Sequence, residues 1–262
     1  MYLRAVHAEQ DIPTLRAFIR ENPLGILTTT IEPSSPSDHF IQSSHIPFIL
    51  DVSDDESPTE LGKLRGHMAR ANPQTKAMIA ELTSRASADS SSSSKTCTLS
   101  KEVLVLFNGP VHHYVTPKFY KQTKPTTGKV VPTWDYAAVQ VYGRVTIYHD
   151  TQDDETDAFI SRAISDLTSF SETTQTGRGV EHGEPWGVED SPETYVALLK
   201  KAIIGIEIEI TDIGGKWKMS QEMKGGDHEG VIEGFEAMGS EAGKAMAETV
   251  RQRGKLADEK KA

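Results

Sequence analysis

The sequence predicts an α+β protein in which a β-barrel is flanked by peripheral helices. Three observations favour this class. About six or seven β-rich segments follow one another in meander-like pairs, and helical segments fall between them at intervals. Alternating βαβ units are too few for a Rossmann fold, and no G-x-G-x-x-G motif is present. We expect a single domain over residues 1–252, followed by a charged, flexible tail over residues 253–262.

Local signals place the elements of the first half of the chain. Asp11 can cap a first helix, and Pro13 suits its first turn. Two β-branched segments then predict a hairpin, and Pro73 can start a second helix. A serine-rich segment at about residues 85–97 is low in complexity, so we expect an insertion there. The expected elements are helices at residues 8–25 and 70–85 and strands at residues 25–32, 39–52 and 61–69.

The second half contains a long loop with four lysines between two of its expected strands. An acidic N-terminal end suits the helix that follows, because the helix dipole favours negative charge there. A regular Ile/Glu alternation predicts a strand, and Gly214-Gly215 predicts a turn into a further strand. The expected elements are strands at residues 102–115, 136–150, 203–213 and 216–223 and helices at residues 151–173, 193–202 and 229–252.

The net charge of −10 limits the classes of partner. Nucleic acid is bound by Lys/Arg surfaces, so the composition gives little support for direct nucleic-acid binding, although it leaves room for a local basic patch. The single cysteine, Cys97, allows no intramolecular disulfide and fits a reducing compartment. Neither a signal peptide nor an apolar run long enough to cross a membrane is evident. We expect a cytoplasmic protein.

A candidate phosphate site lies around the second and third expected strands. Phosphate needs hydroxyls, a cation and free backbone N–H groups at a helix start, and the strand-to-helix turn before Pro73 offers these. The alternative is an N-capped helix with surface arginines. The candidate residues are Ser43, Ser44, His45, His67, Arg70 and Asn72.

Two further groups can contact a ligand. Trp134, Tyr136 and Gln140 share one face of a strand, where the aromatic rings can support a planar ring system. The alternative is that they close a barrel end or a dimer interface. Lys218 and Ser220 alternate on another strand, which indicates an anion site or a solvated edge blunted by lysine.

The sequence predicts no metal site and gives no catalytic residue a role. None of the nine histidines forms a His-x-x-x-His pair, and a single cysteine cannot supply a structural zinc site. No G-x-S-x-G motif points to a serine hydrolase. Enzymatic activity therefore stays open at this level.

Six separated motifs occur in the order and spacing of PaiB-type proteins, and together they resemble that family over nearly the whole chain. Members of the family are described as FMN-binding negative transcriptional regulators. The motifs are HIPFILD (45–51), GKLRGHMARANPQ (62–74), VLVLFNGPVHHYVTPKFY (103–120), VPTWDYAAVQVYGRV (131–145), PWGVEDSPETYVALLKKAIIGIEIEITDIGGKWKMSQ (185–221) and GVIEGFEAMG (230–239).

The resemblance implies a split β-barrel that is similar to pyridoxamine-phosphate oxidases, with FMN bound at the subunit interface of a homodimer. The chain departs from the family pattern at Ser44, Asp135 and Glu222, where the family has Thr, Asn and Asn. The residues implied for the FMN phosphate are Ser43, Ser44, His45, His67, Arg70 and Asn72, those towards the isoalloxazine are Trp134, Tyr136 and Gln140, and those of the family's K-x-SQN stretch are Lys218, Ser220 and Gln221.

The resemblance therefore implies a dimeric flavin-dependent redox protein, an oxidoreductase of unassigned substrate, or a flavin-linked regulator. Two alternatives remain open. One is a non-catalytic transcriptional regulator that acts through a partner. The other is a barrel that holds haem instead of FMN, with His45, His67 or His228 as the axial ligand.

Overall fold

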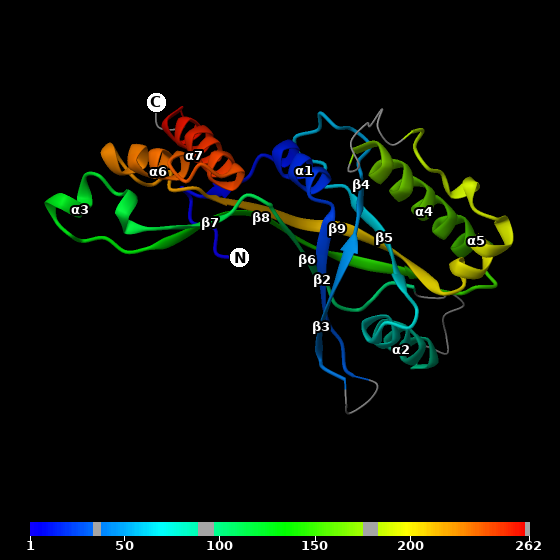
Figure 1. The fold of residues 1–262 in the computed structure, drawn as a ribbon. Helices are drawn as coiled ribbons and strands as arrows, with labels where there is room; N and C mark the ends of the chain where they lie inside the picture. Colours follow the sequence, from blue (N-terminus) through cyan, green and yellow to red (C-terminus); the bar gives the residue numbers. More distant parts are fainter. Residues whose placement is uncertain (34–37, 89–96, 175–182, 260–262) are drawn as a thin grey trace. The chain divides into compact units, whose positions relative to one another are not determined.

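The computed structural model describes residues 1–33, 38–88, 97–174 and 183–259, and it divides the chain into two compact units (Figure 1). Most of the predicted serine-rich insertion lies outside the described residues. The single domain predicted over residues 1–252 stays a prediction. The barrel unit comprises Ile19–Leu106 and Val141–Ile213, and the terminal unit comprises Met1–Phe18, Phe107–Gln140 and Gly214–Ala262.

The sheet of the barrel unit curls until its two edges meet. Its hydrogen-bonded strand order is β3-β2-β6-β8-β9-β5-β4, so β3 (Ile41–Pro47) and β4 (Ile49–Asp51) lie at opposite ends of the order. Only Phe48 separates these two strands along the chain, which a flat sheet cannot accommodate. A Cβ on Gly66 would lie 3.1 Å from the carbonyl oxygen of Pro47, so β5 approaches β3 closely. The predicted split barrel with peripheral helices is confirmed.

The interior of the barrel is filled by every second side chain along its strands, because these side chains face inwards. Leu27, Val105, Val145 and Ile206 are fully buried, as the two-residue period of β-structure requires. Strand β2 pairs antiparallel with both β3 and β6. The remaining strands of this path are β2 (Leu24–Thr30), β5 (Lys63–Ala69), β6 (Val103–Asn108), β8 (Thr133–Tyr148) and β9 (Ile203–Lys218).

Capped helices surround the barrel. Asp153 accepts a hydrogen bond from the backbone N–H of Thr156 at 3.0 Å and so begins α4, whose first turn is acidic as predicted. A Cβ on Gly205 would clash with Phe159 of α4, so this helix packs tightly on β9. The helices of the barrel unit are α2 (Pro73–Ala88), α4 (Asp154–Thr174), the short 3-10 helix η2 (Val188–Asp190) and α5 (Glu193–Lys200).

The terminal unit packs helices against the ends of the two long strands. Phe235 is fully buried and meets the ring of Phe119 edge-on. Trp217 of β9 meets Phe18 of α1 in the same way. The elements of this unit are β1 (Ala8–Glu9), β7 (His113–Val115), η1 (Pro117–Phe119), α3 (Thr123–Thr126), α6 (Gly226–Glu236) and α7 (Glu241–Glu259), and α1 (Ile12–Glu21) begins in it.

Several predicted boundaries are wrong. The strands predicted at residues 39–52 and 102–115 are each two strands, β3 with β4 and β6 with β7. Gly214 and Gly215 do not form a turn, because β9 continues through them to Lys218. A Cβ on Gly215 would lie 2.3 Å from Leu15, so the glycine allows close packing of α1. The C-terminal helix is also two helices, broken near Gly239 with φ 67°, and the second extends past residue 252 to Glu259.

Within the described residues, no helix is both long enough and apolar enough to cross a bilayer.

Candidate functional site

An exposed shelf covers the outer face of β3, β2 and β6 in the barrel unit. Ser43 and His45 point outwards from β3, because the two-residue period of a strand puts both on one face. Ser43 hydrogen-bonds Thr28 of β2 across the pair, with 2.9 Å between the hydroxyl oxygens. Leu24 and Ile41 are 56% and 62% exposed at the two ends of the hairpin. We call this surface the outer shelf; it consists of Leu24, Ile26, Thr28, Ile41, Ser43, His45, Leu104 and Leu106.

Ser44 and Asn72 form a separate contact on the opposite face of β3. The Asn72 side-chain amide donates to the Ser44 hydroxyl at 2.9 Å, and its carbonyl oxygen caps α2 by accepting from the backbone N–H of Gln74. The buried Gln74 amide donates to the carbonyl oxygens of Leu27 and Gln42. Asn72 and Gln74 therefore fasten the start of α2 to the β2–β3 hairpin.

His67 and Arg70 lie on other surfaces of the barrel unit. His67 shares a face of β5 with Arg65, whose guanidinium pairs with Asp166 of α4 at 2.7 Å, so His67 faces the α4 side. Burial lowers the pKa of His67, and its Nδ1 has no hydrogen-bond partner among the described residues.

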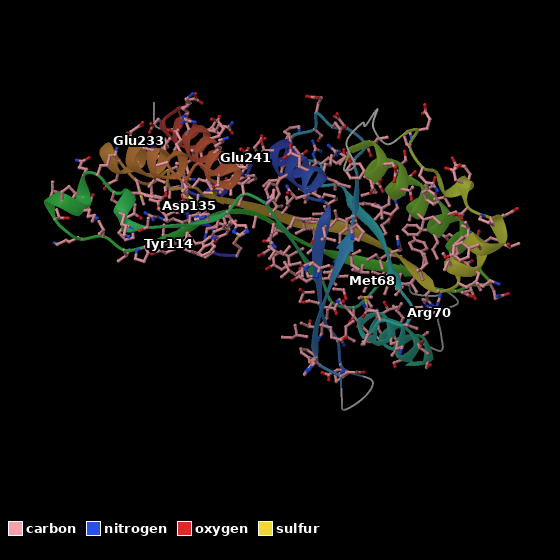
Figure 2. The ribbon with its side chains drawn as sticks, viewed as in Figure 1. Met68, Arg70, Tyr114, Asp135, Glu233 and Glu241 are labelled. Carbon is pink, nitrogen blue, oxygen red and sulfur yellow. The ribbon has the colours of Figure 1, made fainter. Side chains whose placement is uncertain are left out.

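The Arg70 guanidinium lies just beyond the end of β5 (Figure 2). It donates to the carbonyl oxygens of His149, Lys201 and Ile203 at 2.8, 3.2 and 3.2 Å. These bonds occupy Nε and Nη2 and leave the two N–H groups of Nη1 for another acceptor. The six residues predicted for phosphate thus lie on several surfaces of the barrel unit.

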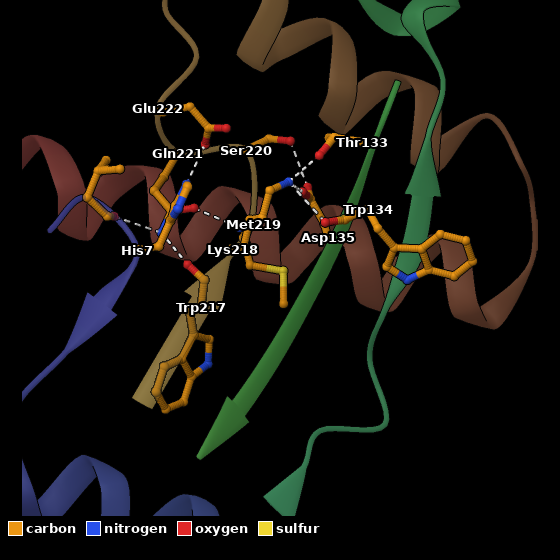
Figure 3. A network of polar contacts seen from close by, with 11 residues as sticks. His7, Thr133, Trp134, Asp135, Trp217, Lys218, Met219, Ser220, Gln221 and Glu222 are labelled. Atoms are coloured by element: carbon orange, nitrogen blue, oxygen red, sulfur yellow. Dashed lines mark hydrogen bonds and ion pairs between the residues drawn. The ribbon is translucent and has the colours of Figure 1, made fainter. Parts of the chain in front are cut away.

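A buried polar network surrounds Asp135 in the terminal unit (Figure 3). The Asp135 side chain is 0% exposed. Ser220 donates its hydroxyl proton to Oδ2 at 2.7 Å, and the Lys218 ammonium lies 3.3 Å from Oδ1. Lys218 also donates to the Thr133 hydroxyl and to the carbonyl oxygen of Trp134. The network therefore joins the first three residues of β8 to the end of β9 and to the residues just after it.

Burial dominates the electrostatics of this network. It raises the pKa of Asp135 from 3.8 to about 6, although the Ser220 hydrogen bond and the Lys218 charge oppose the rise. Burial, followed by the nearby carboxylates of Asp135 and Glu222, raises the pKa of Tyr120 to about 12. Asp135 therefore loses its proton at a higher pH than an exposed aspartate does, whereas Tyr120 stays protonated at neutral pH.

Gln221 and Glu222 lie in the turn that follows β9. Burial works to raise the pKa of Glu222, but a hydrogen bond with His7 at 3.0 Å, its backbone N–H and the Lys218 charge hold the pKa below its usual range. Gln221 is buried, and its amide binds backbone groups of Val6, Trp217 and Met219. Gln221 thus shapes the turn.

The predicted aromatic face is exposed on the terminal unit. Trp134 is 51% exposed, and its indole N–H donates to Nδ1 of His112 at 3.3 Å. Lys216 lies over the ring of Tyr136, and Gln140 accepts a hydrogen bond from the N-terminal ammonium. Trp134, Tyr136 and Gln140 leave β8 on the side opposite to Asp135, as the predicted strand period requires.

The sequence missed the partners of these residues. Thr28 lies outside the six motifs, and Thr133 and His112 lie inside motifs but were not predicted as site residues. Each contacts a predicted residue from a different strand or loop. Strand register would have found Thr28, because the β2–β3 hairpin places it opposite Ser43.

Comparisons with known proteins agree on one family. Residues 1–212 match the family described as "Putative FMN-binding domain". An uncharacterized protein of Aspergillus fumigatus is 56% identical, over 99% of this chain and all of that protein. The "Protease synthase and sporulation protein PAI 2" of Bacillus subtilis is 26% identical, over 96% of this chain and 95% of that protein.

Among solved structures, a conserved hypothetical protein from Mycobacterium tuberculosis has a TM-score of 0.46 at 10% identity, covering 86% of this chain and 95% of that one. The family match spans both units, and the Bacillus relative confirms the resemblance to PaiB-type proteins. The chain therefore belongs to the FMN-binding domain family that includes the PaiB-type proteins.

Proposed function

We propose that this protein binds FMN on the outer shelf of its barrel and that a second copy of the chain completes the site. The observation that carries the proposal is the shelf itself: apolar side chains, two hydroxyls and an imidazole lie together on an uncovered sheet face. Membership of an FMN-binding family supports the choice of ligand.

The residues of the shelf fit the two chemically different ends of FMN. Ile26, Leu104 and Leu106 offer a partly exposed apolar surface on which a flat isoalloxazine can lie. The Ser43 and Thr28 hydroxyls and the His45 imidazole supply hydrogen-bond donors for a phosphate. Asn72 would act indirectly, by holding Ser44 and the start of α2 in place.

The outer shelf is open to solvent, so a flavin bound there would need a second surface to cover it. Ligand sites enclose most of the ligand surface, yet Leu24, Ile41, Ser43 and His45 are all exposed. A second copy can supply the missing wall and bury the apolar residues. The exposed Trp134 and the half-buried Tyr136 and Gln140 are then candidates for contact with the isoalloxazine, and Lys218 and Ser220 would support them through Asp135.

Bound flavin would supply the redox chemistry, and the chain would bind it, orient it and keep water from its ring. No residue of the shelf pairs a general acid with a general base, so substrate and reaction are left unassigned. The family description names FMN and not haem, so haem gains no support. A regulatory role would work through a partner protein, because the net charge of −10 disfavours DNA.

Titration of the purified protein with FMN and with riboflavin tests the proposal. A Ser43→Ala/His45→Ala variant should weaken FMN by about tenfold or more while affecting riboflavin less, because only FMN carries the phosphate. Ser84→Ala, on the exposed surface of α2, serves as the matched control. Absence of FMN binding at micromolar concentration, or equal losses for both ligands, would reject the shelf as the phosphate site.

A further inference from the structure

One stretch of the chain carries basic residues and no acidic ones. Residues 103–134 contain four lysines and neither Asp nor Glu. The rest of the chain therefore carries 24 Lys and Arg against 38 Asp and Glu, a net charge of −14. Within this stretch the lysines lie on residues 112–134, which we call the lysine arm; it contains β7, η1, α3 and the start of β8 (Figure 1).

Three of the four lysines have no ion-pairing partner within the described residues. Lys121 pairs with Glu233 of α6, so its charge is compensated. Lys118, Lys124 and Lys129 are exposed, and no carboxylate of the described chain lies within ion-pairing distance of them. They leave a local charge of about +3 that the chain itself does not neutralise.

The lysine arm also exposes apolar and aromatic surface. Tyr114, Val131 and Trp134 are 43%, 74% and 51% exposed. Tyr114 and Trp134 are opposite each other in the β7–β8 pair and meet edge-on, with 6.3 Å between the ring centroids. His112 fixes the indole by accepting its N–H. Aromatic residues are enriched in protein–protein interfaces, and the lysines beside them suit the polar rim of such a contact.

The opposite charge is concentrated in the barrel unit. Residues 150–157 contain five acids and no basic residue. Asp157 is neutralised by Lys200, and Asp153 caps α4. Asp150, Asp153 and Glu155 line a cavity of about 560 Å³ that Tyr148 also borders. This acidic segment offers carboxylates beside a hollow that side chains of a partner can enter.

We propose that the lysine arm of one copy docks on the acidic segment at residues 150–157 of a second copy. The proposal rests on the homodimer of the proposed function and specifies the contact that holds it. In a two-fold symmetric dimer each copy gives its arm and receives the other's, so the contact forms twice.

Other occupants fit the lysine arm less well. A polyanion such as nucleic acid needs an extended Lys/Arg surface, whereas the arm offers three lysines without ion-pairing partners among the described residues. A membrane would require apolar residues at the leading end of the arm, whereas the turn at residues 123–128 reads Thr-Lys-Pro-Thr-Thr-Gly. The acidic surface of another copy complements the charge of the arm, and a second copy is present wherever the protein is.

Sedimentation of charge-reversal variants tests the contact. Lys118→Glu/Lys124→Glu/Lys129→Glu should raise the dimer dissociation constant by about a hundredfold or more, because like charges would then face each other. Asp154→Lys/Glu155→Lys should do the same, and mixing the two variants should restore a mixed dimer. Asp153 is left intact because it caps α4.

A matched control separates the contact from general repulsion. Lys224→Glu/Lys244→Glu/Lys255→Glu changes the net charge by the same amount at exposed positions of the terminal unit outside the lysine arm, and its dissociation constant should stay within about threefold of wild type. Independently of any variant, raising salt should weaken the wild-type dimer. Reversal variants that dimerise as tightly as the control, or a dimer insensitive to salt, would overturn the proposal, as would a mixture that stays monomeric.

These experiments measure the mass of the assembly and not flavin binding. The proposed lysine-arm contact and the proposed FMN site can therefore be rejected independently. A charge-reversed arm that still dimerises and still binds FMN would reject the lysine arm and leave the flavin site standing. A wild-type dimer that responds to charge reversal but binds no FMN would reject the flavin site and leave the arm standing.

Discussion

Burial and charge conflict at Asp135. Its carboxylate is fully buried on β8, and one lysine and one serine compensate it. Because the pKa of Asp135 is higher in the folded than in the unfolded chain, the folded protein binds this proton more tightly. Ionisation of Asp135 therefore destabilises the fold progressively as pH rises through the interval between about 4 and about 6.

Replacing Asp135 by Asn should remove this cost. The stability of Asp135→Asn relative to wild type should increase between about pH 4 and pH 7 by about 3 kcal/mol, which is the rise of about two pKa units at 1.36 kcal/mol each. Chemical denaturation at a series of pH values measures the difference. The exposed Asp154→Asn should follow the wild-type profile, and a constant offset for Asp135→Asn would show that burial does not control the Asp135 proton.

Arg70 poses a choice between a structural and a ligand-binding role. Its guanidinium already supports three carbonyl oxygens at the end of β8 and the start of β9. Arg70→Ala should therefore lower the free energy of unfolding by about 2 kcal/mol even without FMN, because three carbonyl acceptors, two of them partly buried, lose a charged donor. Thermal denaturation without ligand measures this. If stability is unchanged while FMN affinity falls and riboflavin affinity does not, Arg70 is a phosphate ligand and the structural account is wrong.

The sequence could show which face of a strand a residue occupies, but not what it meets there. Two-residue alternation placed Trp134 and Tyr136 on one face of their strand, because that period is local. The bonds from Asp135 to Lys218 and Ser220 join residues more than eighty positions apart, so no local pattern contains them. The three carbonyl acceptors of Arg70 escaped prediction for the same reason.

At the scale of elements, α2 is held to the barrel by its N-terminal cap. Asn72→Ala removes both the Gln74 N–H acceptor and the bond to Ser44, so it should cost about 1 to 2 kcal/mol of stability. Asn72→Asp keeps the capping acceptor and should recover most of the loss. Urea denaturation of both variants measures the effect. Equal destabilisation by Ala and Asp would indicate that the Ser44 contact, and not the cap, fastens the helix.

Element types were predictable where the periodicity was strong. The first helix with its Asp11 cap and the acidic start of α4 follow from local chemistry. The Gly214-Gly215 pair led to the wrong prediction of a turn. Glycine is favoured both in a turn and at a close packing contact, and only the position of Leu15 in the structure distinguishes the two cases. The closure of the barrel through Phe48 could not be predicted from the sequence either, because it depends on the order of all strands in the sheet.

At the scale of the whole molecule, two surfaces lack a partner within the described chain. The outer shelf exposes apolar side chains on the barrel unit, and the lysine arm exposes lysines and aromatics on the terminal unit. Family membership supplies a ligand for the first, and the acid-rich remainder of the chain supplies a partner for the second. The homodimer that we propose, with flavin enclosed between its copies, would cover both surfaces.

Sedimentation velocity with FMN, monitored at about 450 nm where only flavin absorbs, tests this account most directly. We predict that the flavin signal sediments with twice the mass of one chain, and that the Ser43→Ala/His45→Ala variant moves most of it to the unbound fraction while the protein remains dimeric. Flavin that sediments with a single chain, or that stays entirely unbound beside a well-folded wild-type protein, would contradict the account.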